Sequence, residues 1–327
     1  MQGGHYFFLL FSIGCSTEHA NQTNFDVRDY GAVSGGHIDD SQAWSAACTS
    51  ETENPTLIVP PRFLLNPIVF SDPCRAKNIN FLILGRLLAP DSPGAWKGLD
   101  PSQWLAFNGV SGLNIAGPGR INGRGKAWWD QSCRDRPCLM GCSTLAPTAL
   151  VSCKNSSISD DCVSIGDHTS NIVISYVKCS PGHGISIGSL GRSGKFVQVE
   201  NIHVSKVYLQ GTTNGARIKT WQVGRGYVQR VTFEHNIFGS VKNPVIIDQN
   251  YCNKSGACKE METGVHITDV SFKQLYGTSS SRVAMNLNCS LLVACTRIYL
   301  KSICLRSALA WQNVTSTATM PPALPSE

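Results

Sequence analysis

Short apolar strands recur along this chain at a drifting period of about 30 residues. One set of anchor residues has intervals of 30, 29, 39 and 28 residues: Ile172, Ile202, Val231, Val270 and Ile298. The 39-residue interval contains an insertion, Tyr251–Cys258. A second set has intervals of 33, 28 and 39 residues: Ile185, Ile218, Ile246 and Met285. Repeats of ~20–45 residues are typical of solenoids, and repeats made only of strands predict a β-helix in which each coil covers the apolar edge of the last.

The rest of the chain also predicts strands rather than helices. Phe25–Ala32 predicts a first strand and turn, and Asp39–Cys48 predicts one amphipathic helix that Asp39 or Asp40 can cap. A β-sandwich would need turn signals every ~8–12 residues without a longer period. We therefore predict a single all-β domain over residues 24–327, a right-handed parallel β-helix with a short N-terminal capping helix. Its predicted strands include Leu57–Val59, Ile79–Leu84, Leu113–Ile115, Ile172–Ile174, Ile202–Val207, Val231–Phe233, Val270–Phe272 and Ile298–Leu300.

Composition fits a folded chain with an acidic partner. The 327 residues allow two domains or one large all-β domain. Only 15% of residues are charged and 42% are hydrophobic, which excludes a disordered chain. The net charge of +6 favours an acidic partner. The sequence contains no Lys/Arg-rich block, so we expect no nucleic-acid partner, and the charge is compatible with another polyanion.

Several features predict secretion. Fourteen cysteines exceed what a reduced cytosolic protein of this length usually carries. The apolar run Tyr6–Gly14 is too short to span a bilayer but has the size of a signal-peptide core, so residues 1–20 are predicted to be a signal peptide. No Lys or Arg precedes that run, and a start at the wrong methionine is the alternative. Five glycosylation sequons begin at Asn21, Asn155, Asn253, Asn288 and Asn313.

Four motifs lie in the repeat region. They are Asp160-Asp161-Cys162-Val163-Ser164-Ile165-Gly166, Gly182-His183-Gly184-Ile185-Ser186-Ile187-Gly188-Ser189, Arg217-Ile218-Lys219, and the cysteines Cys162 and Cys179. In this order they resemble the plant polygalacturonases, a pectinase-type glycoside hydrolase family, and the likeness covers most of Phe25–Val314. The resemblance implies a secreted, monomeric enzyme of the plant cell wall. Such an enzyme cleaves α-1,4 bonds of polygalacturonate in pectin, inverts configuration, and needs no cofactor or metal.

The aspartate pair supplies the groups that glycoside hydrolysis needs. One carboxylic acid protonates the leaving oxygen and a second carboxylate activates water, and Asp160 and Asp161 stand together at a strand entrance. Neighbouring negative charges also raise one pKa, which helps to keep an acid protonated. A lone Asp-Asp pair is more often an N-cap or a solvated turn. The resemblance implies that Asp160 is the proton donor and that Asp161 helps to activate water.

His183 follows Asp161 by 22 residues, about one coil, and the apolar residues after the acids repeat after the histidine. This spacing predicts that His183 stacks next to the acids. Its neighbours Gly182 and Gly184 are interpreted as leaving room for a closely approaching ligand. The resemblance implies that His183 supports the site.

Arg217 and Lys219 flank Ile218, so in a strand both cations face one side while the isoleucine faces the core. Two cations on one face suit the carboxylate that every galacturonate unit carries. The ordinary alternative to a binding role is that both side chains lie on a solvent-exposed face of a sheet. The resemblance implies that Arg217 and Lys219 hold the sugar acid.

The chain departs from the family pattern before the aspartate pair. Polygalacturonases carry an Asn-Thr-Asp motif one coil earlier, whose aspartate helps to hold the nucleophilic water. Here the segment between Cys142 and Asp160 contains no Asp or Glu, and about two coils are missing between Trp128 and Asn155. Trp311 stands where the family usually has a cysteine. The alternative to an active hydrolase is therefore a catalytically impaired pectin-binding relative, or a truncated gene product.

The cysteines predict disulfides rather than a metal site, because their spacing matches no zinc pattern and secretion oxidises thiols. Three pairs are close in sequence and similar to those of the family: Cys162–Cys179, Cys252–Cys258 and Cys289–Cys295. Cys48 could pair with Cys74 to tie the N-terminal helix to the first coil. Cys304 has no obvious partner, and four further cysteines crowd the region of the missing coils: Cys133, Cys138, Cys142 and Cys153.

Overall fold

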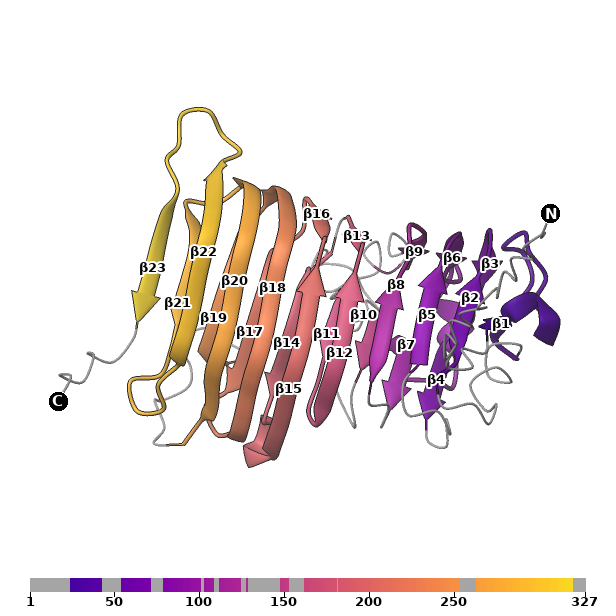
Figure 1. Cartoon of the computed structure of the whole chain (residues 1–327), viewed down its shortest axis with the longest axis horizontal. Helices are drawn as coiled ribbons and strands as arrows, with labels where there is room; N and C mark the ends of the chain where they lie inside the picture. The colour runs from indigo at the N-terminus through magenta and orange to yellow at the C-terminus, as the bar shows by residue number, and fades with distance from the viewer. Residues whose placement is uncertain are drawn as a thin grey trace, which may run out of the picture.

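The computed structural model describes residues 24–42, 54–71, 79–100, 103–108, 112–124, 128, 148–152, 162–180, 182–252 and 263–319. Within these ranges the chain is a long solenoid of strands whose N- and C-terminal coils lie at opposite ends (Figure 1). The pairings between its strands are parallel, and strands of successive coils lie side by side. The predicted parallel β-helix is therefore confirmed.

Three sheets form the walls of the described solenoid. The first has 11 strands: β1 (Asn24–Asp26), β2 (Thr56–Val59), β5 (Ile79–Ile83), β8 (Leu113–Ala116), β12 (Thr169–Ser175), β13 (Lys178–Cys179), β15 (Phe196–Ser205), β16 (Tyr208–Gln210), β18 (Arg225–Val241), β20 (Val265–Ser279) and β22 (Thr296–Ser307). The second has nine: β4 (Ile68–Ser71), β7 (Gln103–Asn108), β10 (Thr148–Ser152), β11 (Val163–Ile165), β14 (Ile185–Leu190), β17 (Asn214–Trp221), β19 (Asn243–Tyr251), β21 (Val283–Asn288) and β23 (Thr315–Thr319). The third has three: β3 (Phe63–Leu64), β6 (Arg86–Leu88) and β9 (Arg120–Asn122).

The remaining elements of the described chain are short. The 3-10 helices are η1 (Val27–Tyr30), η2 (Pro93–Trp96) and η3 (Arg192–Gly194). The predicted helix Asp39–Cys48 lies mostly outside the described residues, but Ser41 and Gln42 are helical there. Asp39 accepts a hydrogen bond from the Ser41 backbone N–H at 3.1 Å, which is the geometry of an N-cap.

The first set of anchor residues forms one continuous ladder. Its members pair in register across β12, β15, β18, β20 and β22: Ile172, Ile202, Val231, Val270 and Ile298. All but Ile298 are buried. The period read from the sequence is therefore the true coil length in this wall.

The second set of predicted anchor residues differs from the observed register by one or two residues. Ile185 pairs with Ala216 rather than with Ile218, and Ala216 pairs with Val245 rather than with Ile246. The inward ladder is Ile185, Ala216, Val245 and Met285. Ala216 was overlooked because Ile218 is the larger of two inward residues on β17, and a one-residue slip at Ile246 exchanges the two faces of a strand.

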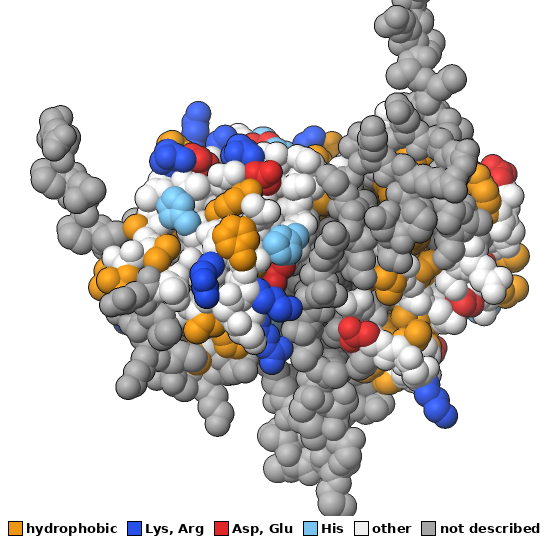
Figure 2. All heavy atoms as spheres, turned by 90° about the horizontal axis from the view of Figure 1, so that it is seen from below, with side chains coloured by type: hydrophobic (Ala, Val, Ile, Leu, Met, Phe, Trp, Pro, Cys, Tyr) orange, Lys and Arg blue, Asp and Glu red, His pale blue; other side chains and the backbone are white. Residues whose placement is uncertain are grey.

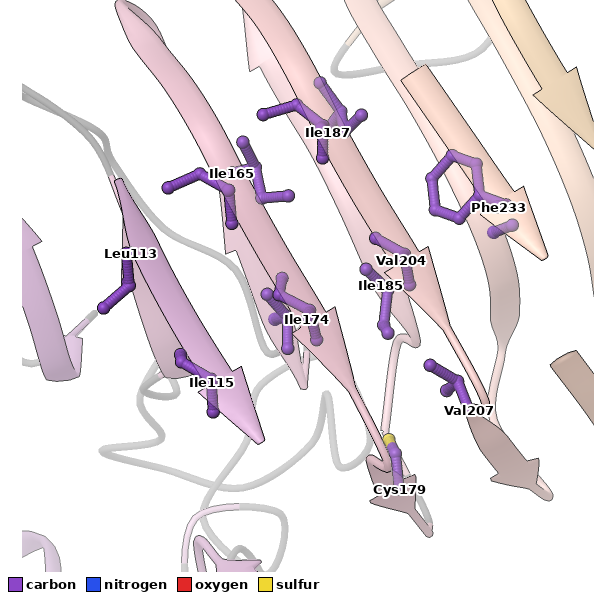
Figure 3. Packing of buried hydrophobic residues seen from close by; sticks show 14 of the residues in the cluster. Leu113, Ile115, Ile165, Ile174, Cys179, Ile185, Ile187, Val204, Val207 and Phe233 are labelled. Atoms are coloured by element: carbon purple, nitrogen blue, oxygen red, sulfur yellow. The ribbon is translucent and has the colours of Figure 1, made fainter. Parts of the chain in front are cut away.

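The core is a stack of like side chains from successive coils (Figure 3). Phe233 of β18 lies against Phe272 of β20 with parallel rings 5.5 Å apart, and both rings are fully buried. In β15 the burial of side chains alternates along most of the strand. This alternation places one face of each strand on the core and the other on the surface.

Single left-handed residues bend the long strands at the corners of the coils. The sequence does not indicate these corners. The predicted strand Val231–Phe233 has three residues, whereas β18 spans 17 residues. One corner row has φ between 51° and 58°: Asn171, Asn201, Arg230, Asp269 and Arg297. Asn201 Nδ2 donates to Asn171 Oδ1 at 2.8 Å, and Arg230 Nε donates to Asn201 Oδ1 at 2.6 Å. Asn and Asp tolerate this conformation better than other non-glycine residues do, and here the polar side chains of the row also link one coil to the next.

The two large walls differ in strand count near the middle of the chain. In the nine-stranded sheet β10 lies between β7 and β11. In the 11-stranded sheet β8 pairs directly with β12, through Asn114 with Val173 and Ile115 with Ile174. Among the described residues, the coil of β10 thus has no counterpart in the other wall. This irregularity lies in the segment where the sequence lacks the Asn-Thr-Asp motif.

Two of the predicted disulfides are formed. Cys162 is bonded to Cys179, and Cys289 is bonded to Cys295. Cys252 is also disulfide-bonded, whereas Cys304 is free and exposed. The cysteines that fall outside the described residues are Cys48, Cys74, Cys133, Cys138, Cys142, Cys153 and Cys258.

Because the core depends on stacked rings, we predict that Phe233→Ala lowers the free energy of unfolding by about 3–5 kcal/mol, through lost burial and the cavity left against Phe272. Tyr299→Ala, at an exposed ring of β22, is the control and should change it by about 0.5 kcal/mol or less. Denaturant titration followed by circular dichroism measures both. Equal effects of the two substitutions would contradict the ring-stacking account.

Candidate active site

The structure describes three of the five predicted site residues. His183, Arg217 and Lys219 are described, while Asp160 and Asp161 lie outside the described residues. The Cys162 backbone N–H donates to the Gly184 carbonyl oxygen at 2.9 Å. A backbone hydrogen bond thus joins Cys162, which follows Asp161 in the sequence, to Gly184, which follows His183.

The register of the strands that carry these motifs agrees with the predicted coil spacing. Val163 of β11 pairs with Ile185 of β14, and Ile165 pairs with Ile187. The next strand, β17, contributes Arg217 beside Ser186. The segments that bear the three motifs are therefore consecutive in one sheet.

Arg217 and Lys219 converge on one aromatic ring. Ile218 between them is fully buried as predicted, but Lys219 is itself only 4% exposed, so burial does not alternate along this motif. The Arg217 guanidinium carbon lies 5.7 Å from the centre of the Tyr251 ring, and Lys219 Nζ lies 5.8 Å from it. The ring of Tyr251 is held by an edge contact with Trp221, with centroids 5.1 Å apart. Two cations over one ring form a pre-set anion site, since cation–π contacts restrain both side chains.

Sequence reasoning missed Tyr251 and Trp221 as site residues. Tyr251 ends β19 and marks the start of the segment interpreted only as an insertion. Its contact with the cations depends on a register shift between β17 and β19, after which Trp221 pairs with Tyr251. A spacing argument cannot find such a shift.

Asp248 of β19 is a third component that the sequence did not indicate. It pairs in register with Lys219 across the β17–β19 ladder. Asn288 Nδ2 donates to its Oδ1 at 3.0 Å, and the Asn250 backbone N–H donates to the same oxygen at 3.2 Å. Burial raises the pKa of Asp248, although these hydrogen bonds and the charge of Arg217 favour its ionised form. The site thus contains a partly buried carboxyl group next to its cations.

Asp167 follows β11, whereas Asp160 and Asp161 precede this strand in the sequence. Burial raises the pKa of its carboxyl group, and Oδ1 accepts the Gly191 backbone N–H at 3.3 Å. The carboxyl group therefore links two turns of successive coils.

The interpretation of Gly184 as room for a ligand was wrong. Its φ is +79°, and a Cβ at this position would lie 2.1 Å from the carbonyl oxygen of Asn214 in the next coil. The space beside Gly184 is filled by backbone of the protein itself. Glycine is required there because the coils pack closely, and the residue fixes the chain beside His183.

On the face seen from below, basic side chains of the described residues gather over the strands that bear the site. In the view from below, Lys and Arg side chains in blue gather over the C-terminal half, next to residues drawn in grey (Figure 2). A local excess of cations favours approach of an anionic ligand.

A comparison with protein families now assigns the chain. The model of glycosyl hydrolases family 28 matches residues 48–158 and 148–320. This chain belongs to glycosyl hydrolases family 28. It is 36% identical to a probable polygalacturonase of Arabidopsis thaliana over 92% of this chain and 78% of the relative. It is 34% identical to a polygalacturonase of Malus domestica, again over 92% and 78%.

The fold comparison includes the endo-xylogalacturonan hydrolase of Aspergillus tubingensis, with a TM-score of 0.49, 18% identity, and coverage of 91% of this chain and 100% of that one. The sequence alignments are informative about length. The alignment with the Arabidopsis relative extends over 358 positions, more than the 327 residues of this family 28 chain. The relative therefore has residues without counterpart here. The two parts of the family match overlap at residues 148–158, a range that includes β10.

The buried Asp248 predicts a specific pH dependence. Its pKa is raised in the folded state, so the folded protein loses stability relative to Asp248→Asn as the pH rises from about 4 through the raised pKa. Below that window the two proteins should differ least. Denaturant titrations between about pH 3 and pH 7 measure the difference, and the exposed Asp29→Asn controls for loss of one charge. If the free energy of unfolding of the parent did not fall relative to that of Asp248→Asn as the pH rises, the burial of an ionisable carboxyl group here would be contradicted.

Proposed function

We propose that this family 28 chain is a secreted hydrolase of the plant cell wall that cleaves α-1,4-galacturonosidic bonds of polygalacturonate. The observation that carries the proposal is the pair of cations, Arg217 and Lys219, held over Tyr251 one coil from His183. Each sugar of the substrate has a carboxylate that such a pair can bind. Arg217 suits it by two parallel N–H bonds and Lys219 by a point charge.

The reaction inverts the anomeric centre in one displacement. Asp160 donates its proton to the glycosidic oxygen as the bond to the leaving sugar breaks, and a water molecule attacks the anomeric carbon from the opposite face. Asp161 accepts the proton of that water. The hydrogen bond from Cys162 to Gly184 supports this assignment, because it fixes the chain after Asp161 beside the chain after His183.

A second candidate function is pectin binding with little or no hydrolysis. The segment before Asp160 has no acidic residue back to Cys142, and β8 pairs directly with β12 at this level. Both observations support the proposal that coils bearing an Asn-Thr-Asp motif are missing. Without that aspartate the nucleophilic water loses one of its holders, and a misplacement of ~1 Å already costs about a hundredfold in rate. The cation pair would still bind the sugar acid.

Secretion and glycosylation belong to the same proposal. No helix in the described ranges has the length and apolar character needed to cross a membrane. Of the two described sequons, Asn313 is exposed, whereas the amide nitrogen of Asn288 donates to Asp248. We expect a glycan on Asn313 rather than on Asn288, because the Asn288 amide is already bonded within the protein.

Release of reducing ends from polygalacturonate tests the function. We predict that Asp160→Asn abolishes any hydrolysis while leaving the fold intact, because the change is nearly isosteric and removes only the transferable proton. Circular dichroism of the variant controls for folding. Unchanged turnover in Asp160→Asn would contradict its role as the acid. Binding of polygalacturonate without any release by the unmodified chain would favour the second candidate function.

Lys219→Ala tests substrate recognition. We predict about tenfold weaker binding of oligogalacturonate, since a charge-assisted contact with a carboxylate is lost. Binding of a neutral galactan of equal length should change much less. Lys195→Ala, at an exposed lysine that precedes β15, controls for the loss of one positive charge. Equal losses for the charged and neutral ligands would show that Lys219 only supports the sheet.

A further inference from the structure

A second surface of the solenoid combines tyrosines and lysines. It follows the corner at which the 11-stranded sheet turns from its longer segments into β13 and β16. An outward row crosses five strands there in register: Lys178, Tyr208, Ile237, Tyr276 and Cys304. The corner residues beside this row include Tyr176 and Lys206, both in the left-handed conformation. We call these seven residues the tyrosine–lysine strip.

The strip is a surface feature and not part of the core. Tyr176 is 52% exposed, Ile237 49% and Tyr276 44%. Residues that follow the outward row along the chain, such as Leu209 and Phe238, are buried. The strip therefore points away from the solenoid interior. Its span across five paired strands is about 20 Å.

Lysine and tyrosine side chains are already organised within the strip. Lys206 Nζ lies 4.6 Å from the centre of the Tyr176 ring and donates to the Tyr176 hydroxyl at 2.6 Å. Lys178 Nζ lies 5.3 Å from the centre of the Tyr208 ring, and the Tyr208 hydroxyl donates to Gln210 Oε1 at 2.5 Å. An ammonium group has three N–H donors, and Lys206 uses one of them on Tyr176. The restrained lysines keep donors for a ligand at little further cost in side-chain entropy.

The charge around the strip is mostly positive. The neighbouring outward row is Ser175, Ser205, Glu234, Lys273 and Lys301. Together the strip and this row carry four lysines and one carboxylate, Glu234, which lies 3.4 Å from His203 and 3.8 Å from His235. The surface therefore complements an anionic partner.

The strip lies on a different wall from the candidate active site. Arg217 and Lys219 belong to β17 of the nine-stranded sheet, whereas the strip belongs to the 11-stranded sheet, with the apolar core between the two walls. In Figure 1 β13 and β16 lie side by side at the upper edge of the solenoid. A ligand in the site cannot reach the strip through the protein.

We propose that the tyrosine–lysine strip is a second binding site, separate from the catalytic one, for a linear acidic polysaccharide built of uronate sugars. Tyrosine rings offer flat apolar surface for sugar rings, and the lysines face the carboxylates. The strip repeats along the solenoid axis at one residue per strand, which suits a polymer of repeating charged units better than a folded protein surface. The identity of the sugar rests on the proposed function.

Retention of the chain in gels that contain polygalacturonate tests the proposal. The full chain is used in an Asp160→Asn background to prevent cleavage, with a short oligogalacturonate present to fill the site. We expect Lys178→Ala/Tyr208→Ala to weaken retention about tenfold, and added salt to weaken that of the parent. Lys178→Glu, which leaves every ring in place, should act in the same direction. Gels with neutral galactan should retain all variants equally.

Lys97→Ala/Trp311→Ala is the matched control, because it removes an exposed lysine and an aromatic side chain that is 84% exposed, both outside the strip. Equal retention of the strip variants and this control would overturn the proposal. The strip residues lie outside the site, so strip variants with Asp160 intact should release reducing ends from short oligogalacturonates at the parent rate. Loss of retention in a chain that never hydrolyses would support the strip and reject the proposed hydrolase. Hydrolysis by the parent, together with strip variants that are retained as well as the parent, would support the proposed hydrolase and reject the strip.

Discussion

Parallel pairing of each coil with the next is the constraint on which the rest of this structure depends. Because every strand hydrogen-bonds to its equivalent one coil away, a residue type repeated at the coil period forms a continuous row through the molecule. The same rule that stacks Phe233 on Phe272 in the core arranges Arg217 beside Ser186 in the nine-stranded sheet. Stability and the site are thus two results of one register.

The rows explain what the sequence could and could not predict. Large β-branched residues such as Ile172 and Ile202 revealed one wall without error, because each coil has one dominant apolar anchor there. In the other wall a small inward residue, Ala216, competed with Ile218, and the register slipped. Corner residues such as Arg230 carry no left-handed signature in their type, so the strand lengths could not be read. The sequence thus reveals which positions carry large apolar side chains, but it does not reveal which residues adopt a positive φ.

The candidate site, too, could be predicted from the sequence only in part. The motifs with His183, Arg217 and Lys219 were recognisable because they are local in sequence. Tyr251 and Asp248 come from the next coil and act only through pairing with β17, so spacing within a motif could not find them. Gly184 was detected for the wrong reason, since its missing side chain accommodates Asn214 rather than a ligand.

The direct pairing of β8 with β12 has a consequence for how the two large walls are matched along the axis. Among the described residues, β10 separates β7 from β11 in the nine-stranded sheet, whereas no described strand separates β8 from β12. A strand occupies about 4.8 Å along the axis. A polymer that lies along the nine-stranded sheet therefore crosses one strand more between β7 and β14 than it would cross between β8 and β15 on the other wall.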